Sequence, residues 1–155
     1  MSLALGAKAL AWATEGHGET EDGYCQRWVR QVIQDVYGDA YNAFMLESAK
    51  KSAIAWKKAR ADSTLPQGVS VLVTSDYKQT MIGDILYKTI GSGDFGHVGI
   101  RVLGNKVAEN SSTNYGRTHG ALGFRKLVRE TGDPASAWWG SPNVVVRLPQ
   151  PQGEV

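Results

Sequence analysis

The sequence predicts an α+β protein in which N-terminal helices pack on a small antiparallel β-sheet. Apolar residues recur at helical spacing until about residue 61. From Leu65 onward, short segments rich in β-branched residues alternate with Gly, Asn, Asp and Pro, a pattern typical of strands and turns. Because the helices come first and the strands follow, an antiparallel sheet is favoured over alternating βαβ units.

Three helices are expected. Residues 3–14 predict a short packing helix that Gly16 interrupts. A second helix begins near Cys25, with Asp22 as a candidate N-cap, and ends at Gly38. Residues 39–61 predict a longer helix with one apolar face and one lysine-rich face, which is a solvated surface or favours an acidic ligand.

The strands are expected in the second part of the chain, and residues 103–106 predict a hairpin turn within it. No repeat or linker is visible, so we expect one domain over residues 1–150 and a disordered tail over residues 151–155. The predicted strands cover residues 69–73, 83–90, 97–103, 106–110 and 144–148.

Net charge, cysteine count and the length of apolar runs limit the kinds of molecule that this protein is expected to bind and the places where it is expected to act. A net charge of +2 over 155 residues is too weak to predict nucleic-acid binding, but it is compatible with an anionic polymer such as bacterial cell wall. One cysteine cannot form an internal disulfide, and no apolar run approaches the ~18 residues of a membrane span. We read no signal peptide, so we expect a protein that is made in the cytoplasm and reaches the wall through lysis or a dedicated export route. We also expect a monomer.

Cys25 is the candidate nucleophile. It lies in the first turn of the second predicted helix, where unpaired N–H groups and the positive end of the helix dipole stabilise a thiolate. Cys25 is also three and four residues from Trp28 and Val29, on the apolar stripe, so an inert core thiol is the alternative.

A candidate base and a group to orient it lie on a predicted hairpin. His97 starts an apolar strand, and Glu109 lies on the strand after the turn. Alternation lets both side chains emerge on one sheet face, where one ring nitrogen of His97 can bond the carboxylate. A thiol on a helix packed near the other nitrogen would complete the nucleophile, base and orienting group of a cysteine hydrolase.

Four motifs, in this order and at these spacings, resemble the CHAP amidohydrolase/peptidases and their NlpC-type relatives: Gly23–Val29, Gly83–Ile85, Gly96–Ile100 and Val107–Ser111. The resemblance covers roughly residues 15 to 112. It implies a papain-like fold and a thiol hydrolase, an amidase or endopeptidase, that degrades bacterial peptidoglycan as phage endolysins do.

The resemblance also implies roles for single residues. Cys25 would be the nucleophile, His97 the general base and Glu109 the third member of the triad, with Asn110 as the alternate third member, because a one-residue bulge would exchange the two. Tyr24 and Gln26 flank the nucleophile and would line the oxyanion hole or the cleft; alternatively they are ordinary residues at a helix start.

No cofactor is expected, although some CHAP members bind calcium ahead of the cysteine. Glu19, Glu21 and Asp22 offer oxygen ligands there, but they lack EF-hand spacing and are more simply a solvated acidic loop. A zinc site at Cys25 and the histidines lacks the close ligand pairs that such sites use.

Other residues and activities stay open. Asp84 is interpreted as a turn residue at the start of a strand, His17 and His119 as surface residues. Aromatic residues in loop-like stretches could stack on sugar rings, but packing is favoured: Tyr115, Trp138 and Trp139. Alternative functions are acyl transfer or deamidation of a protein by the same triad, and a wall-binding module without catalysis.

Overall fold

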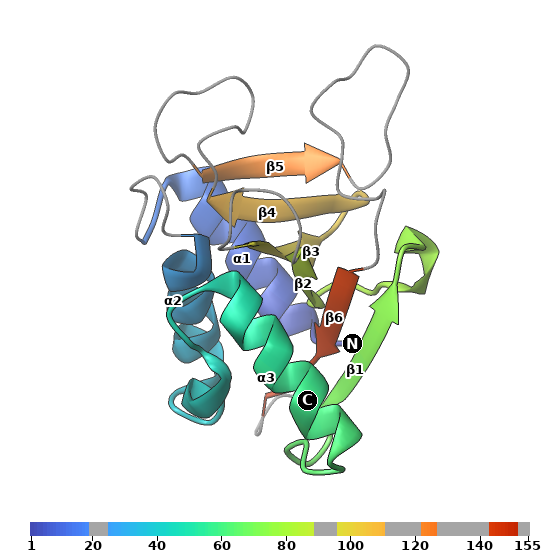
Figure 1. Cartoon of the computed structure of the whole chain (residues 1–155). Helices are drawn as coiled ribbons and strands as arrows, with labels where there is room; N and C mark the ends of the chain where they lie inside the picture. Colours follow the sequence, from blue (N-terminus) through green and yellow to red (C-terminus); the bar gives the residue numbers. More distant parts are fainter. Residues whose placement is uncertain (19–24, 89–95, 111–121, 127–142, 152–155) are drawn as a thin grey trace.

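The computed structural model confirms the α+β fold, with helices packed on an antiparallel sheet (Figure 1). Among the described residues, the three α-helices are α1 (Leu3–Glu15), α2 (Cys25–Tyr37) and α3 (Ala49–Ala61). The described part of the chain comprises residues 1–18, 25–88, 96–110, 122–126 and 143–151.

In the part of the chain that the structure describes, the sheet has six antiparallel strands in the order β1-β6-β2-β3-β4-β5. Five of them match predicted strands, and β5 was not expected from the sequence. The strands are β1 (Ser70–Thr74), β2 (Ile85–Lys88), β3 (His97–Val102), β4 (Lys106–Asn110), β5 (Leu122–Lys126) and β6 (Asn143–Arg147).

The prediction of one helix over residues 39–61 is wrong in its first half. The 3-10 turn Asn42–Phe44 is followed by irregular chain, and α3 begins only at Ala49. Ser48 is the reason for this boundary, because it has extended backbone angles and its hydroxyl accepts a hydrogen bond from the Lys51 N–H at 3.1 Å. A serine in this conformation caps a new helix instead of continuing an old one.

The main core lies between the helices and one face of the sheet. Trp28 and Val29 of α2, Trp56 of α3 and Ile100 of β3 are all fully buried in it. A second, smaller cluster contains Leu86, Val107 and Val145. Their neighbours along each strand belong to the main core, so the two clusters lie on opposite faces of the sheet.

Tyr37, the last residue of α2, joins the two ends of the described chain. Its hydroxyl donates to the Pro149 carbonyl at 2.6 Å and accepts from the Ser2 hydroxyl at 2.6 Å. Pro149 therefore lies against the body of the protein. Residues 152–155 of the expected tail lie outside the described part. Within the described residues, no helix is both long and apolar enough to cross a membrane.

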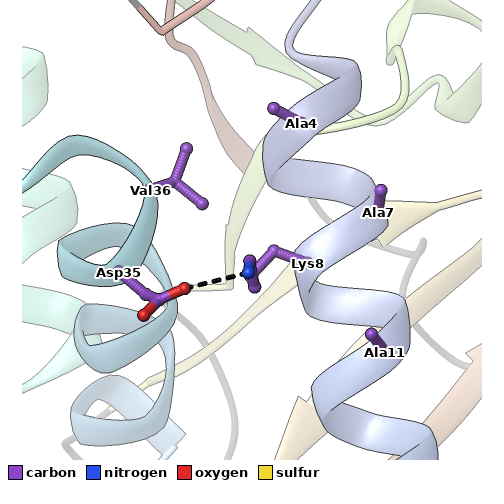
Figure 2. Close-up of a pocket in the computed structure, with 6 residues that line it drawn as sticks. All are labelled: Ala4, Ala7, Lys8, Ala11, Asp35 and Val36. Atoms are coloured by element: carbon purple, nitrogen blue, oxygen red, sulfur yellow. Dashed lines mark ion pairs between the residues drawn. The ribbon is translucent and has the colours of Figure 1, made fainter.

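A shallow groove separates α1 from α2 on the surface (Figure 2). Three alanines of α1, at positions 4, 7 and 11, face Val36 of α2. Lys8 crosses the groove to Asp35, with 3.1 Å between the ammonium nitrogen and a carboxylate oxygen. Both side chains are more than 40% exposed, so this ion pair contributes little to stability.

Candidate active site

Three elements place Cys25, His97 and Glu109. Cys25 is the first residue of α2, His97 the first of β3, and Glu109 lies near the end of β4. The strands β3 and β4 pair in the register Ile100 to Ala108, which places Glu109 across from Gly99. His97 and Glu109 are therefore diagonal neighbours on one face, as alternation predicts.

His97 and Glu109 are joined by a buried hydrogen bond. The His97 Nε2 lies 2.7 Å from the Glu109 Oε2, and the two residues are 9% and 0% exposed. Asn110 is also buried, but it is the next residue along β4 and so lies on the opposite side of the strand. Of the two candidates for the third position, Glu109 contacts the ring.

Gly99 lets the two strands approach closely at this point. A Cβ atom on Gly99 would lie 2.3 Å from the Val107 Cγ1, 2.9 Å from the Ala108 carbonyl oxygen and 3.4 Å from the Glu109 Cβ. Any larger residue would force β4 away from β3. The absence of a side chain at position 99 thus leaves room for the Glu109 side chain beside His97.

The surroundings of His97 favour its protonated form. Burial by itself lowers the pKa of the ring, but the charge of Glu109 and hydrogen bonds with Cys25 and Glu109 outweigh burial and raise the pKa to about 9. The ring is therefore an imidazolium near pH 7. Since Glu109 takes Nε2, the nitrogen left for Cys25 is Nδ1.

Cys25 is a free thiol that is partly exposed. It packs against the edge of the main core, yet its side chain is close enough to His97 to hydrogen-bond with the ring. The thiol thus lies between the core and an imidazolium, at the start of a helix whose first N–H groups are free of helical partners. A cation and a helix start both stabilise a thiolate.

Gln26 lies beneath the surface, not along a cleft. It is 4% exposed, and its Nε2 donates to the Ser52 hydroxyl at 2.7 Å. The expectation that its side chain lines the oxyanion hole or the cleft does not agree with this position. Its amide instead links α2 to α3 directly behind Cys25.

One residue close to the thiol, Tyr87, carries no sequence signal for this position. Tyr87 of β2 is fully buried and accepts a hydrogen bond from the Trp56 Nε1 at 3.3 Å. Burial raises the pKa of Tyr87 far above its ordinary value, so its hydroxyl stays neutral. In the sequence Tyr87 is one aromatic residue among many in a predicted strand, and nothing there indicates that it lies near Cys25.

Asp84 lies just before β2, as its interpretation as a turn residue predicts, and it is fully buried. Its carboxylate accepts from the Arg147 Nε and Nη2 at 2.9 and 2.8 Å, and from the Met81 N–H at 2.8 Å. This bidentate ion pair between Asp84 and Arg147 joins the start of β2 to the end of β6. Its partners fix its position and give it a structural role.

Several predicted site residues lie outside the described residues. They are Tyr24, the calcium candidates Glu19, Glu21 and Asp22, and the loop residues Tyr115, His119, Trp138 and Trp139. Across the described residues, no group of three His, Cys, Asp or Glu side chains is arranged to hold a metal ion. His17 is exposed, and its ring packs at a tilt of 58° against Trp12 with ring centroids 4.3 Å apart, in agreement with a surface position.

No protein-family model matches the chain, and no curated protein matches its sequence. Solved structures do share its fold. The endolysin LysIME-EF1 matches 97% of this chain with a TM-score of 0.54 and 17% identity. Ly7917 with the hydrolyzing product of MDP matches 92% of this chain with a TM-score of 0.51 and 16% identity. Ly7917 alone matches 96% of this chain with a TM-score of 0.52 and 13% identity. The chain covers 66%, 62% and 63% of these three chains.

Proposed function

We propose that this chain is a cysteine hydrolase that cleaves amide bonds of bacterial peptidoglycan, as an amidase or an endopeptidase, through Cys25, His97 and Glu109. The observation that carries this proposal is the ring of His97, which is hydrogen-bonded to a buried carboxylate and lies close enough to the partly exposed Cys25 thiol for the thiol to raise the pKa of the ring. This is the set of groups that thiol hydrolases use on several folds.

The first half of the reaction forms a thioester. The Cys25 thiolate attacks the amide carbonyl, and the carbonyl oxygen becomes an oxyanion. The backbone N–H of Cys25, at the free end of α2, donates to that oxyanion, a type of contribution worth about 3 kcal/mol. His97 then gives its Nδ1 proton to the leaving nitrogen, the C–N bond breaks and the amine departs.

The second half releases the acid. With its proton gone, His97 takes one from a water molecule, whose oxygen attacks the thioester carbon. The C–S bond breaks, the thiolate returns and the ring keeps the proton. Glu109 holds the ring in one orientation throughout and stabilises its positive charge.

The choice of substrate rests on the fold. One structure of similar fold is an endolysin, and another was solved with a hydrolysis product of MDP. The motif order around Cys25, His97 and Glu109 also resembles the CHAP peptidoglycan hydrolases. Together these observations favour peptidoglycan over a protein substrate.

The activity is tested on purified peptidoglycan with the wild-type protein, Cys25→Ala and Cys25→Ser. We expect the wild type to release free amino groups, and both variants to lose this release by at least about 10³-fold. Mass spectrometry of the soluble fragments identifies the bond that is cleaved. Full release by Cys25→Ala would exclude the mechanism, and binding to the wall without any release by the wild type would indicate a binding module.

The state of the thiol is tested separately by alkylation with iodoacetamide. Reaction near neutral pH should be fast in the wild type and slow in His97→Ala, because the imidazolium stabilises the thiolate. His17→Ala is the matched control, since His17 is exposed and its ring packs against Trp12. A thiol that reacts only after denaturation would establish Cys25 as an inert core residue.

A further inference from the structure

The first turn of α3 contacts residues next to both Cys25 and His97. On one side, Gln26 follows Cys25 and donates to Ser52 of α3 at 2.7 Å. On the other, a Cβ atom on Gly96 would lie 3.2 Å from the Lys50 backbone nitrogen and 3.4 Å from the Lys50 Cβ. Lys50 therefore lies against the residue that precedes His97, and α3 begins near the start of α2 (Figure 1).

Gly96 is required for this close contact. Its φ of +71° is in the left-handed region, and an added Cβ would lie 2.6 Å from the Lys88 carbonyl oxygen. The chain is thus held near α3 as it enters β3. Consequently the backbone of Lys50 lies close to the residue that precedes His97.

The Lys50 ammonium has no acidic partner among the described residues. Two other lysines of α3 are paired, Lys51 with Glu47 and Lys58 with Asp62, whereas Lys50 is partly exposed and makes no ion pair in this part of the chain. A cation on the helix turn that contacts the neighbours of Cys25 and His97 is available to a ligand. An ammonium on a flexible stem suits a carboxylate as a point charge.

We propose that Lys50 binds a carboxylate of the substrate close to the bond that is cleaved, and so selects peptides that carry a free carboxyl group there over peptides in which it is an amide. This assignment rests on the proposed hydrolase function. It adds a specificity residue on α3 to the groups on α2, β3 and β4. The positive end of the α3 dipole acts in the same direction as the Lys50 charge.

The test compares two stem peptides of one sequence, one with a carboxylate next to the cleaved bond and one with a carboxamide. For the wild type we expect a higher kcat/KM on the carboxylate peptide. In Lys50→Gln the ratio of the two kcat/KM values should fall about tenfold, mainly through KM. Lys57→Gln is the matched control, because Lys57 lies two turns along the same face of α3, is exposed and is unpaired among the described residues.

A ratio that is unchanged in Lys50→Gln, or one that falls equally in Lys57→Gln, would overturn the role of Lys50. Calorimetry with Cys25→Ala and Cys25→Ala/Lys50→Gln separates this outcome from a failure of the hydrolase proposal. If the wild type cleaves neither peptide, hydrolysis is refuted, yet weaker binding of the carboxylate peptide to the double variant would still support the contact. Equal binding to both proteins would refute the contact itself.

Discussion

The imidazolium of His97 should make the stability of the protein depend on pH in the alkaline range. Its pKa is about 9 in the folded protein, against about 6.5 for an unperturbed histidine in an unfolded chain. Because the folded state binds this proton more tightly, protonation stabilises it. The stabilisation is complete below about pH 6.5 and is lost as the pH rises through about 9.

The size of the effect follows from the two pKa values. A rise from about 6.5 to about 9 corresponds to about 3 kcal/mol in the free energy of unfolding. The His97 side chain is only 11% exposed and Glu109 is fully buried, so solvent screens this pair little. For a domain of ordinary stability, about 3 kcal/mol is a large fraction of the total.

The measurement is urea denaturation at several values between about pH 6 and about pH 10. The double variant His97→Gln/Glu109→Gln serves as the reference, because it retains two hydrogen-bonding side chains of similar size but cannot titrate at either position. Subtracting its free energy of unfolding from that of the wild type removes the contribution of all other titrating groups. We expect the difference to shrink by about 3 kcal/mol across this range.

Two results would refute the reasoning. If the free energies of the two proteins run parallel with pH, the His97 proton contributes nothing to folding. If NMR titration gives the His97 ring a pKa near 6.5, the carboxylate and the thiol do not outweigh burial.

Three further predictions concern single contacts. Glu109→Gln should lower kcat on peptidoglycan by about 10³-fold with an unchanged circular dichroism spectrum, and wild-type turnover would contradict its role. Gly99→Ala should reduce the free energy of unfolding in urea by about 1 to 3 kcal/mol, since the new methyl group meets Val107, and an unchanged midpoint would show that β4 yields easily. Asp84→Asn should cost about 3 kcal/mol in thermal unfolding because Arg147 loses its buried partner, and no change in Tm would show that water replaces it.

Most of the fold could be predicted from periodicity and turn residues. The apolar spacing around Trp28 and the glycines at positions 16 and 38 were sufficient for α1 and α2. The segment before Ser48 was misread because its apolar residues have helical spacing, while the cap at Ser48 depends on its backbone conformation. Strand β5 carries a weak signal, since its five residues include one glycine and two basic residues, and its pairing with β4 is a tertiary contact.

The candidate site residues also fall into those that local sequence motifs predicted and those that only the tertiary structure could place. Local motifs pointed to Cys25, His97 and Glu109, because a helix start and a hairpin can each be read from neighbouring residues. The choice of Glu109 over Asn110 needed the register of β3 and β4, which one inserted residue would reverse. The burial of Gln26 against Ser52 could not be predicted, because it depends on how two helices pack across a loop.

The position of Tyr37 has a consequence for anything joined to this chain. Cys25 and Tyr37 are the first and last residues of the same helix, so their backbones lie at opposite ends of an axis about 18 Å long. Because Tyr37 holds both Ser2 and Pro149, the two ends of the described chain lie at the pole remote from the thiol, and an attachment made there would be far from Cys25. A long polymer could then approach Cys25 without meeting such an attachment.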